Sequence, residues 1–91
     1  IMIFEQELKD KGFEIIGGRL YYDFSDFETL WADVSDRNCA DGSKAIAISN
    51  LTLADHVNAI THISINYTLY FRDINKFYEL LTLLGYKISY K

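Results

Sequence analysis

The alternation of apolar and polar residues over positions 61–71 is the cleanest in the chain, and this pattern constrains the fold more than any other feature of the sequence. Successive side chains of a β-strand point to opposite faces, so the alternation predicts one long strand with a buried face and an exposed face. The buried face is expected to carry Ile63, Ile65, Tyr67, Leu69 and Phe71. The exposed face is expected to carry His62, Ser64, Asn66, Thr68 and Tyr70. A strand of this kind belongs to a sheet that is covered on one side only.

The first quarter of the chain predicts a short helix followed by a hairpin. Phe4 and Leu8 stand four positions apart within residues 2–11, as they would on one face of a helix. Gly12 follows, and glycine commonly ends helices because it adopts the left-handed conformation. A Gly-Gly pair at 17–18 then separates two β-prone runs and predicts a tight turn. The second strand of this hairpin places on one face Leu20, Tyr22 and Phe24.

A second helix is predicted from Asp26 to Asp36. Ser25 and Glu28 form a capping-box pattern, in which the two side chains accept hydrogen bonds from free backbone N–H groups at a helix start. The apolar residues that follow recur at the helical spacing of i, i+3, i+4 and i+7. These residues are Phe27, Leu30, Trp31 and Val34.

The rest of the chain predicts further strands and helices. Residues 44–49 alternate as a short strand, and residues 51–60 favour a short helix, with an irregular crossover as the alternative. The expected start of that helix is a threonine-to-aspartate cap pattern at 52–55. Asp73 is placed to cap a third helix that Gly85 ends. A final strand is expected to alternate through Tyr86, Ile88 and Tyr90.

From residue 19 onward the predicted order is strand, helix, strand, strand, helix, strand, which is the βαββαβ order of ferredoxin-like folds. The length of 91 residues allows one domain, spanning 1–91. We therefore expect an α+β protein, a two-layer sandwich with an antiparallel sheet, preceded by an extra N-terminal helix and strand. The open face of the sheet is expected to carry Tyr21, His62, Ser64, Asn66, Thr68, Tyr70 and Ser89.

Negative charge is concentrated between Leu20 and Ser43. That segment has a balance of −5, so the formal net charge of −4 leaves +1 on the rest of the chain. An acidic protein is poorly suited to bind phosphate backbones, and we expect no direct contact with nucleic acid. On the predicted second helix, Asp26, Asp33 and Asp36 lie opposite the apolar stripe and form an acidic ridge. The six acids of the segment are Asp23, Asp26, Glu28, Asp33, Asp36 and Asp41.

The residue types that carry catalysis or bind metals show no recognised spacing. The set comprises Asp55, His56, His62 and Cys39, and the sequence contains no CxxC or HxxxH pair. We therefore expect no enzymatic activity, no cofactor and no metal site. The single cysteine excludes an internal disulfide, and residues 2–6 lack the pattern of an export signal, which together predict a cytoplasmic protein. The apolar stretches are shorter than the ~20 residues of a membrane-spanning helix.

The acidic ridge predicts an interaction protein without enzymatic activity, an inhibitor or modulator that docks on the basic surface of a nucleic-acid-handling partner. Phage anti-defence proteins and immunity proteins share this size and charge, an analogy without any sequence match. Tyr21 and Tyr70 join the six acids as candidate partner-binding residues, because tyrosine supplies contact area at low entropy cost. The alternatives are a ferredoxin-like small-molecule or metal-binding module, and a structural oligomerisation unit. A homodimer would form through Leu80 and Leu83 of the third predicted helix.

Overall fold

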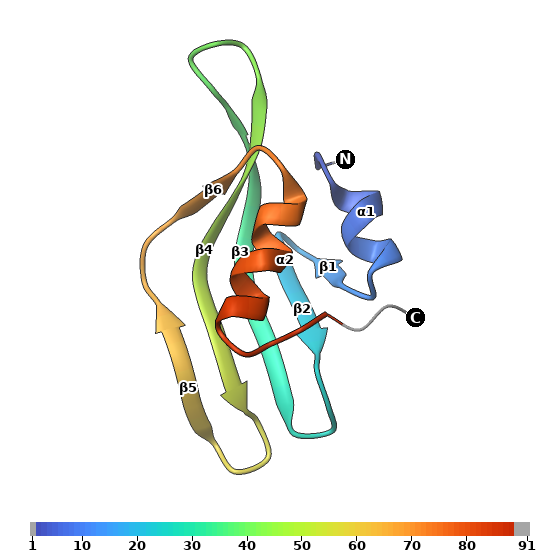
Figure 1. Ribbon diagram of the computed structural model, residues 1–91, viewed down its shortest axis with the longest axis vertical. Coiled ribbons are helices and arrows are strands. Elements are labelled where there is room, and N and C mark those ends of the chain that lie inside the picture. The colour runs from blue at the N-terminus through green and yellow to red at the C-terminus, as the bar shows by residue number, and fades with distance from the viewer. Residues whose placement is uncertain (1, 89–91) are drawn as a thin grey trace.

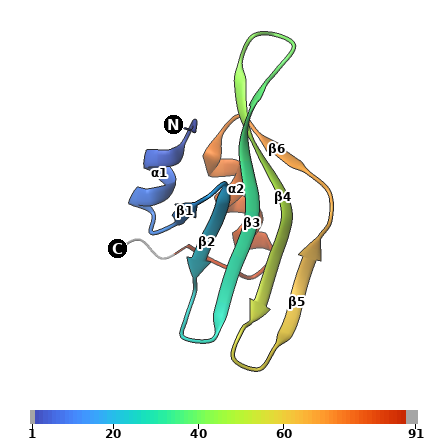
Figure 2. The same cartoon turned by 180° about the vertical axis from the view of Figure 1, so that it is seen from behind.

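The computed structural model describes residues 2–88, within which a six-stranded antiparallel sheet is accompanied by two short helices (Figure 1). In chain order the elements are α1 (Glu5–Asp10), β1 (Glu14–Ile16), β2 (Arg19–Asp23), β3 (Glu28–Asn38), β4 (Lys44–Asp55), β5 (Ile60–Ile65), β6 (Leu69–Phe71) and α2 (Ile74–Leu83). Strands β1 to β5 lie side by side in sequence order, and β6 pairs with β4 beyond the end of β5. α2 lies across one face of the sheet, and the view from behind shows the other face uncovered by any helix of the described chain (Figure 2). Neither of these helices is long and apolar enough to cross a membrane.

The core lies between α2 and the sheet. Phe77 and Leu81 of α2 have no exposed surface and belong to one cluster with Leu30 of β3 and Leu53 of β4. α1 contributes Leu8, which is also fully buried. Removal of this apolar surface from water is the main stabilising term, at roughly 25 cal/mol per Å².

The predicted ferredoxin-like βαββαβ order is wrong, because the segment predicted as the second helix is strand β3. Its core-facing side chains alternate with period two: Leu30, Ala32 and Val34 are all buried. Leu30 and Val34 are four positions apart and therefore satisfy the helical spacing as well as the strand spacing. The pattern of apolar residues did not distinguish the two structures. Most of the described chain therefore forms an antiparallel sheet, and α2 is the helix that lies across it.

The predicted start of the second helix is instead the turn between β2 and β3. Ser25 Oγ accepts hydrogen bonds from the backbone N–H groups of Phe27 (3.2 Å) and Glu28 (3.0 Å), as a helix N-cap would. The N–H of Phe24, however, donates to the carbonyl oxygen of Glu28 at 2.8 Å and closes a hairpin. The serine therefore stabilises a turn in which the chain reverses.

The short helix predicted for residues 51–60 is also wrong, since β4 continues to Asp55 and β5 begins at Ile60. Asp55 Oδ1 accepts the backbone N–H groups of Val57 (3.0 Å) and Asn58 (2.9 Å). An aspartate that accepts these bonds stabilises a turn and a helix start alike, so the cap pattern was ambiguous here as well.

The single strand predicted over 61–71 is two strands, with a break at 66–68. β5 pairs with the second half of β4 and β6 pairs with the first half. Within the break, the hydroxyl group of Thr68 is 2.8 Å from the hydroxyl group of Ser49 on β4. Tyr67 was expected on the buried face, but it lies within the break and is 73% exposed.

The N-terminal elements and the third predicted helix are confirmed. Phe13 N–H donates to the carbonyl oxygen of Leu8 at 3.0 Å, which ends α1 at the predicted place. The turn at 17–18 joins β1 to β2. Asp73 is the N-cap of α2, and its side chain accepts the N–H of Asn75 at 3.0 Å.

The predicted final strand is not formed by residues 86–88, which follow α2 without strand pairing. Tyr86 instead packs on Phe24, with ring centroids 5.1 Å apart. The predicted positions Ser89 and Tyr90 lie outside the described residues.

Candidate binding site on the open sheet face

A depression of about 410 Å³ lies where β1, β2 and β3 adjoin, on the face of the sheet opposite α2. The strand register brings its side chains together, because Glu14 is opposite Tyr21, and Asp23 is opposite Thr29. Tyr21 and Asp23 alternate along β2 with the buried Leu20 and therefore point away from the core. The residues that line the depression are Gly12, Glu14, Ile16, Tyr21, Tyr22, Asp23 and Thr29.

Gly12 occupies a position of the depression that only glycine fills without strain. Its φ of +96° lies in the left-handed region, which side chains with a Cβ rarely adopt. A Cβ at this position would stand 3.4 Å from Cε1 of the buried Tyr22 ring, at the short end of van der Waals contact. The chain therefore passes close to β2 where it enters β1.

The depression carries two carboxylates and an aromatic ring. Glu14 and Asp23 supply the carboxylates, and Tyr21 is opposite Glu14 in the strand register and two positions before Asp23 on β2. Thr29 Oγ1 is 2.9 Å from Asp23 Oδ1 and 3.2 Å from the carbonyl oxygen of Tyr22, so its hydroxyl ties the end of β2 to β3. This hydrogen bonding fixes the position of the Asp23 carboxylate.

The arginine of β2 is directed to another acid of the same face. Arg19 Nε is 3.1 Å from Asp33 Oδ1, and Asn50 Nδ2 donates to Asp33 Oδ2 at 2.9 Å. The hydrogen bonds from Asn50 and Arg19 hold the pKa of Asp33 below its usual value. The hydrogen bond to Asp33 raises the pKa of Arg19, with a smaller contribution from Tyr21. Asp33 is thus compensated locally.

The predicted acidic ridge on a helix face does not exist, because its carboxylates follow a strand. Asp33 and Asp36 are three positions apart on β3 and project to opposite faces. Asp36 Oδ1 accepts the backbone N–H of Ile3 at 2.8 Å, on the side of α1. Asp26 is exposed in the turn between β2 and β3.

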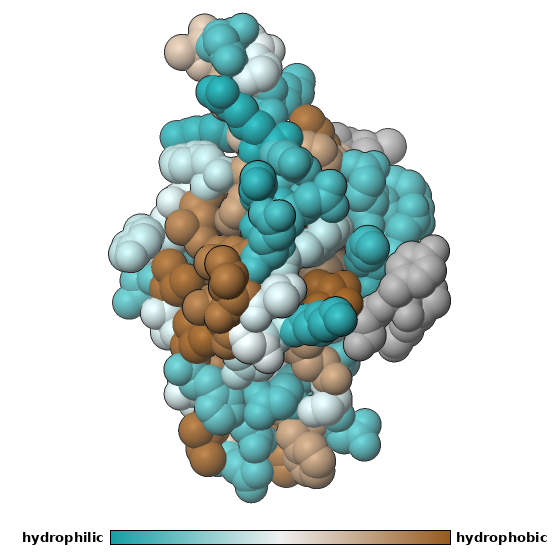
Figure 3. Space-filling view, in the orientation of Figure 1, coloured by the Kyte–Doolittle hydropathy of each residue, from teal (hydrophilic) through white to brown (hydrophobic). Residues whose placement is uncertain are grey.

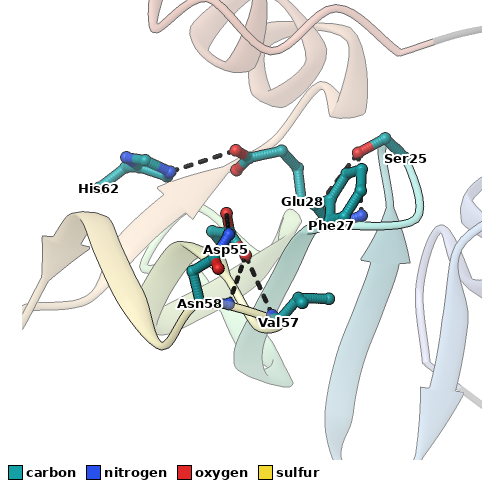
Figure 4. Close-up of polar contacts among 7 residues, drawn as sticks. All are labelled: Ser25, Phe27, Glu28, Asp55, Val57, Asn58 and His62. Carbon is teal, nitrogen blue, oxygen red and sulfur yellow. Dashed lines mark hydrogen bonds and ion pairs between the residues drawn. The ribbon is translucent and has the colours of Figure 1, made fainter.

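The remaining two acids are each paired with a distant residue. Glu28 Oε1 is 3.2 Å from His62 Nε2, and Figure 4 shows the two side chains pointing toward one another. Asp41 Oδ2 is 3.5 Å from Arg72 Nη1, and hydrogen bonds from Ser43 lower the pKa of Asp41. Of the six predicted acids, Asp23 is the one that lines the depression.

Tyr21 lies in the depression as well, whereas the other predicted contact residues lie elsewhere. Tyr70 of β6 is 53% exposed and stands beneath Arg37, whose guanidinium carbon is 5.5 Å from the ring centroid. On α2, Leu83 is 84% exposed and Leu80 is partly buried.

The sequence interpretation missed Glu14 and Thr29. The Gly-Gly turn at 17–18 could have identified Glu14. In a hairpin with a two-residue turn, the residues at equal distances from the turn pair with one another, and this register sets Glu14 opposite Tyr21. Thr29 could not be placed in this way, because its own segment, which is strand β3, is predicted to be a helix.

The geometry suits a positively charged group. Two carboxylates offer ion pairs and charge-assisted hydrogen bonds, and a tyrosine ring attracts a cation on its face. Among the described residues, no three His, Cys, Asp or Glu side chains are grouped so as to hold a metal ion. Comparisons with protein-family models, with curated proteins and with solved structures find no match to this chain.

Proposed function

We propose that this chain is a protein-binding module without enzymatic activity, which receives a lysine or arginine side chain of its partner in the depression between β1 and β3. The convergence of Glu14, Tyr21 and Asp23 in one depression carries the proposal. Its volume of about 410 Å³ falls within the roughly 300–1,000 Å³ of pockets that enclose small ligands. By binding a basic side chain of its partner, the module would block or modulate the partner's basic surface.

Each lining group has a counterpart on a basic side chain. The carboxylates of Glu14 and Asp23 pair with the charged head group, and an arginine fork can meet a carboxylate through two parallel hydrogen bonds. Ile16, which is 61% exposed, offers apolar surface to the methylene stem. An acidic net charge of −4 favours approach of a basic partner at low salt.

The test is a ¹⁵N NMR titration with two short peptides, acetyl-Gly-Arg-Gly-amide and the same peptide with citrulline, which keeps the shape of arginine and lacks its charge. The arginine peptide is expected to shift the amide signals of Tyr21, Asp23 and Thr29. The citrulline peptide is expected to leave them unchanged, because neutral groups gain little from the carboxylates. Equal shifts with both peptides, or no shifts with either at about 10 mM, would overturn the proposal.

The titration also separates a protein partner from a small cation. Spermidine carries charged amines without a peptide backbone, and it serves as the comparison ligand. If spermidine binds the depression at least about tenfold more tightly than the arginine peptide, the site is one for small cations, and the proposal of a protein partner fails.

A further inference from the structure

We infer that the same basic partner also covers a second surface, at the end of the sheet formed by the turns β2–β3 and β4–β5, an inference that rests on the proposed function. This hairpin-end surface consists of Phe27, Val57 and Ile60. The three side chains are 52%, 57% and 52% exposed. Figure 3 shows apolar side chains on either side of this lower end of the molecule, with hydrophilic ones between them.

A backbone hydrogen bond holds the two turns together. The N–H of His56 donates to the carbonyl oxygen of Phe27 at 3.0 Å, so the β4–β5 turn adjoins the β2–β3 turn. Ile60 is opposite Asp55 in the strand register, and Asp55 is opposite Glu28. Phe27 and Val57 therefore adjoin across the two turns, and Ile60 begins the strand that leaves the β4–β5 turn.

Both turns are built to keep a single shape. Asn58 Nδ2 donates to Asp55 Oδ2 at 2.8 Å, in addition to the two backbone N–H groups that Asp55 accepts (Figure 4). Ala59 has a φ of +57°, an uncommon conformation for a residue with a Cβ. Such strain is kept where the surrounding structure fixes it, and it is frequent at sites of function. An ordered apolar surface loses little conformational entropy when a partner covers it.

The charges around this surface indicate what covers it. Asp26 and Glu28 flank Phe27 in the sequence, and Asp55 is opposite Glu28 and Ile60 in the strand register. The two hairpin segments 20–36 and 45–71 contain no lysine or arginine. An anionic lipid surface is repelled by such a border. A protein with an apolar pocket bordered by lysine or arginine is complementary to it, as in interfaces with an apolar centre and a polar rim.

The hairpin-end surface adjoins the depression along one hairpin. Asp23 and Thr29 pair at the last position of the β2–β3 ladder, and the turn that carries Phe27 follows directly. A partner that places a basic side chain in the depression therefore reaches the hairpin end with the adjacent part of its surface.

The probe for the second surface is the peptide acetyl-Arg-Leu-Trp-Leu-Arg-amide, compared with the same peptide flanked by glutamates. The arginine-flanked peptide is expected to shift the amide signals of Phe27, Val57 and Ile60, and to bind at least about tenfold more tightly than the glutamate-flanked one. Phe27→Ser is expected to weaken this binding about tenfold. Val57→Ser provides a second variant, and Leu83→Ser on α2 provides the matched control, because Leu83 is 84% exposed and lies on another element.

The outcomes distinguish this inference from the proposed function. If acetyl-Gly-Arg-Gly-amide shifts the depression while the arginine-flanked peptide leaves the hairpin end unchanged, the inference is overturned and the proposed function stands. Equal binding of the arginine-flanked and glutamate-flanked peptides overturns the inference that the hairpin-end surface selects a basic partner by charge. Cosedimentation with phosphatidylcholine vesicles that is lost in Phe27→Ser assigns the surface to a membrane and overturns the inference. Self-association that is lost in Phe27→Ser assigns it to a second copy, with the same consequence.

Discussion

The backbone N–H of His56 donates to the carbonyl oxygen of Phe27 at 3.0 Å, and this one bond joins the two turns at the end of the sheet. Phe27 and His56 are 29 positions apart in the sequence, and each of the two turns is closed by a side chain that accepts hydrogen bonds as a helix cap does. Ser25 serves the first turn and Asp55 serves the second. Their junction places apolar side chains from both turns on one surface, beside the depression that contains Asp23.

We expect Gly12→Ala to destabilise the protein by about 1–2 kcal/mol, because alanine is strained at a φ of +96° and its Cβ would stand 3.4 Å from the ring of Tyr22, with little room to spare. Gly85→Ala is the matched control. Its φ of +95° imposes the same strain, but nothing lies within 4 Å of the added Cβ. Urea unfolding should show a larger loss for Gly12→Ala, and equal losses would show that the contact with Tyr22 contributes nothing.

Phe77→Ala is expected to cost about 3–5 kcal/mol, since Phe77 has no exposed surface and contacts the rings of Phe13 and Phe71. Leu83→Ala on the outer side of the same helix should change the free energy of unfolding by no more than about 0.5 kcal/mol. Thermal unfolding followed by circular dichroism measures both. A small effect at Phe77 would contradict the position of α2 on the sheet.

Tyr78 should ionise at a higher pH than an ordinary tyrosine side chain. Burial raises the pKa of Tyr78 to about 12, and the nearby Glu7 and Asp10 add to this effect. Spectrophotometric titration should therefore show a late step that is missing in Tyr78→Phe. Because the folded state holds this proton more tightly, the associated stability is full below pH 10 and is lost as the pH rises toward 12. A titration in which Tyr78→Phe removes a step near pH 10 would contradict the packing of Tyr78.

Asp33 should contribute to acid unfolding. Hydrogen bonds from Asn50 and Arg19 lower the pKa of Asp33 in the folded state below its ordinary value of 3.8. The stability that this shift supplies is present above pH 3.8 and decreases as the pH falls through the lower, folded-state value. The free energy of unfolding should therefore fall less between about pH 4 and pH 2 in Asp33→Asn than in the original protein. Parallel curves would show that the Arg19 and Asn50 contacts do not persist in solution.

The sequence predicted the N-terminal helix, the first hairpin and the C-terminal helix, because glycines and a capping aspartate mark their ends. Gly12, the pair at 17–18, Asp73 and Gly85 each require or favour one backbone conformation, whatever the tertiary structure. These residues act locally, and local signals are the ones that a single sequence displays.

The central part of the fold was not predictable from local signals. Residues 28–38 satisfy a helical spacing and a strand spacing at Leu30 and Val34, and the choice is made by pairing with β2 and β4 on both sides. Propensity is a weak prior that tertiary contacts override. Because the helix was the basis for the acidic ridge, the predicted grouping of Asp26, Asp33 and Asp36 failed with it.

Half of the candidate site followed from the sequence. Tyr21 and Asp23 were singled out, although for a different surface, while Glu14 was missed because the hairpin register was not used to pair residues across the turn. The hairpin-end surface was not predicted, since it depends on contact between two turns whose segments were taken for helices.

The most direct measurement of the central claim is the dissociation constant of acetyl-Gly-Arg-Gly-amide for three proteins: the original chain, Glu14→Gln/Asp23→Asn, and Asp26→Asn. Asp26 is an exposed acid outside the depression, so its variant controls for net charge. The double variant should bind at least about tenfold more weakly, and the affinity of the original chain should fall as salt rises from about 50 to 500 mM. Asp26→Asn should retain affinity close to that of the original chain. Equal affinity of the original chain and the double variant would contradict the claim that the depression receives a basic side chain.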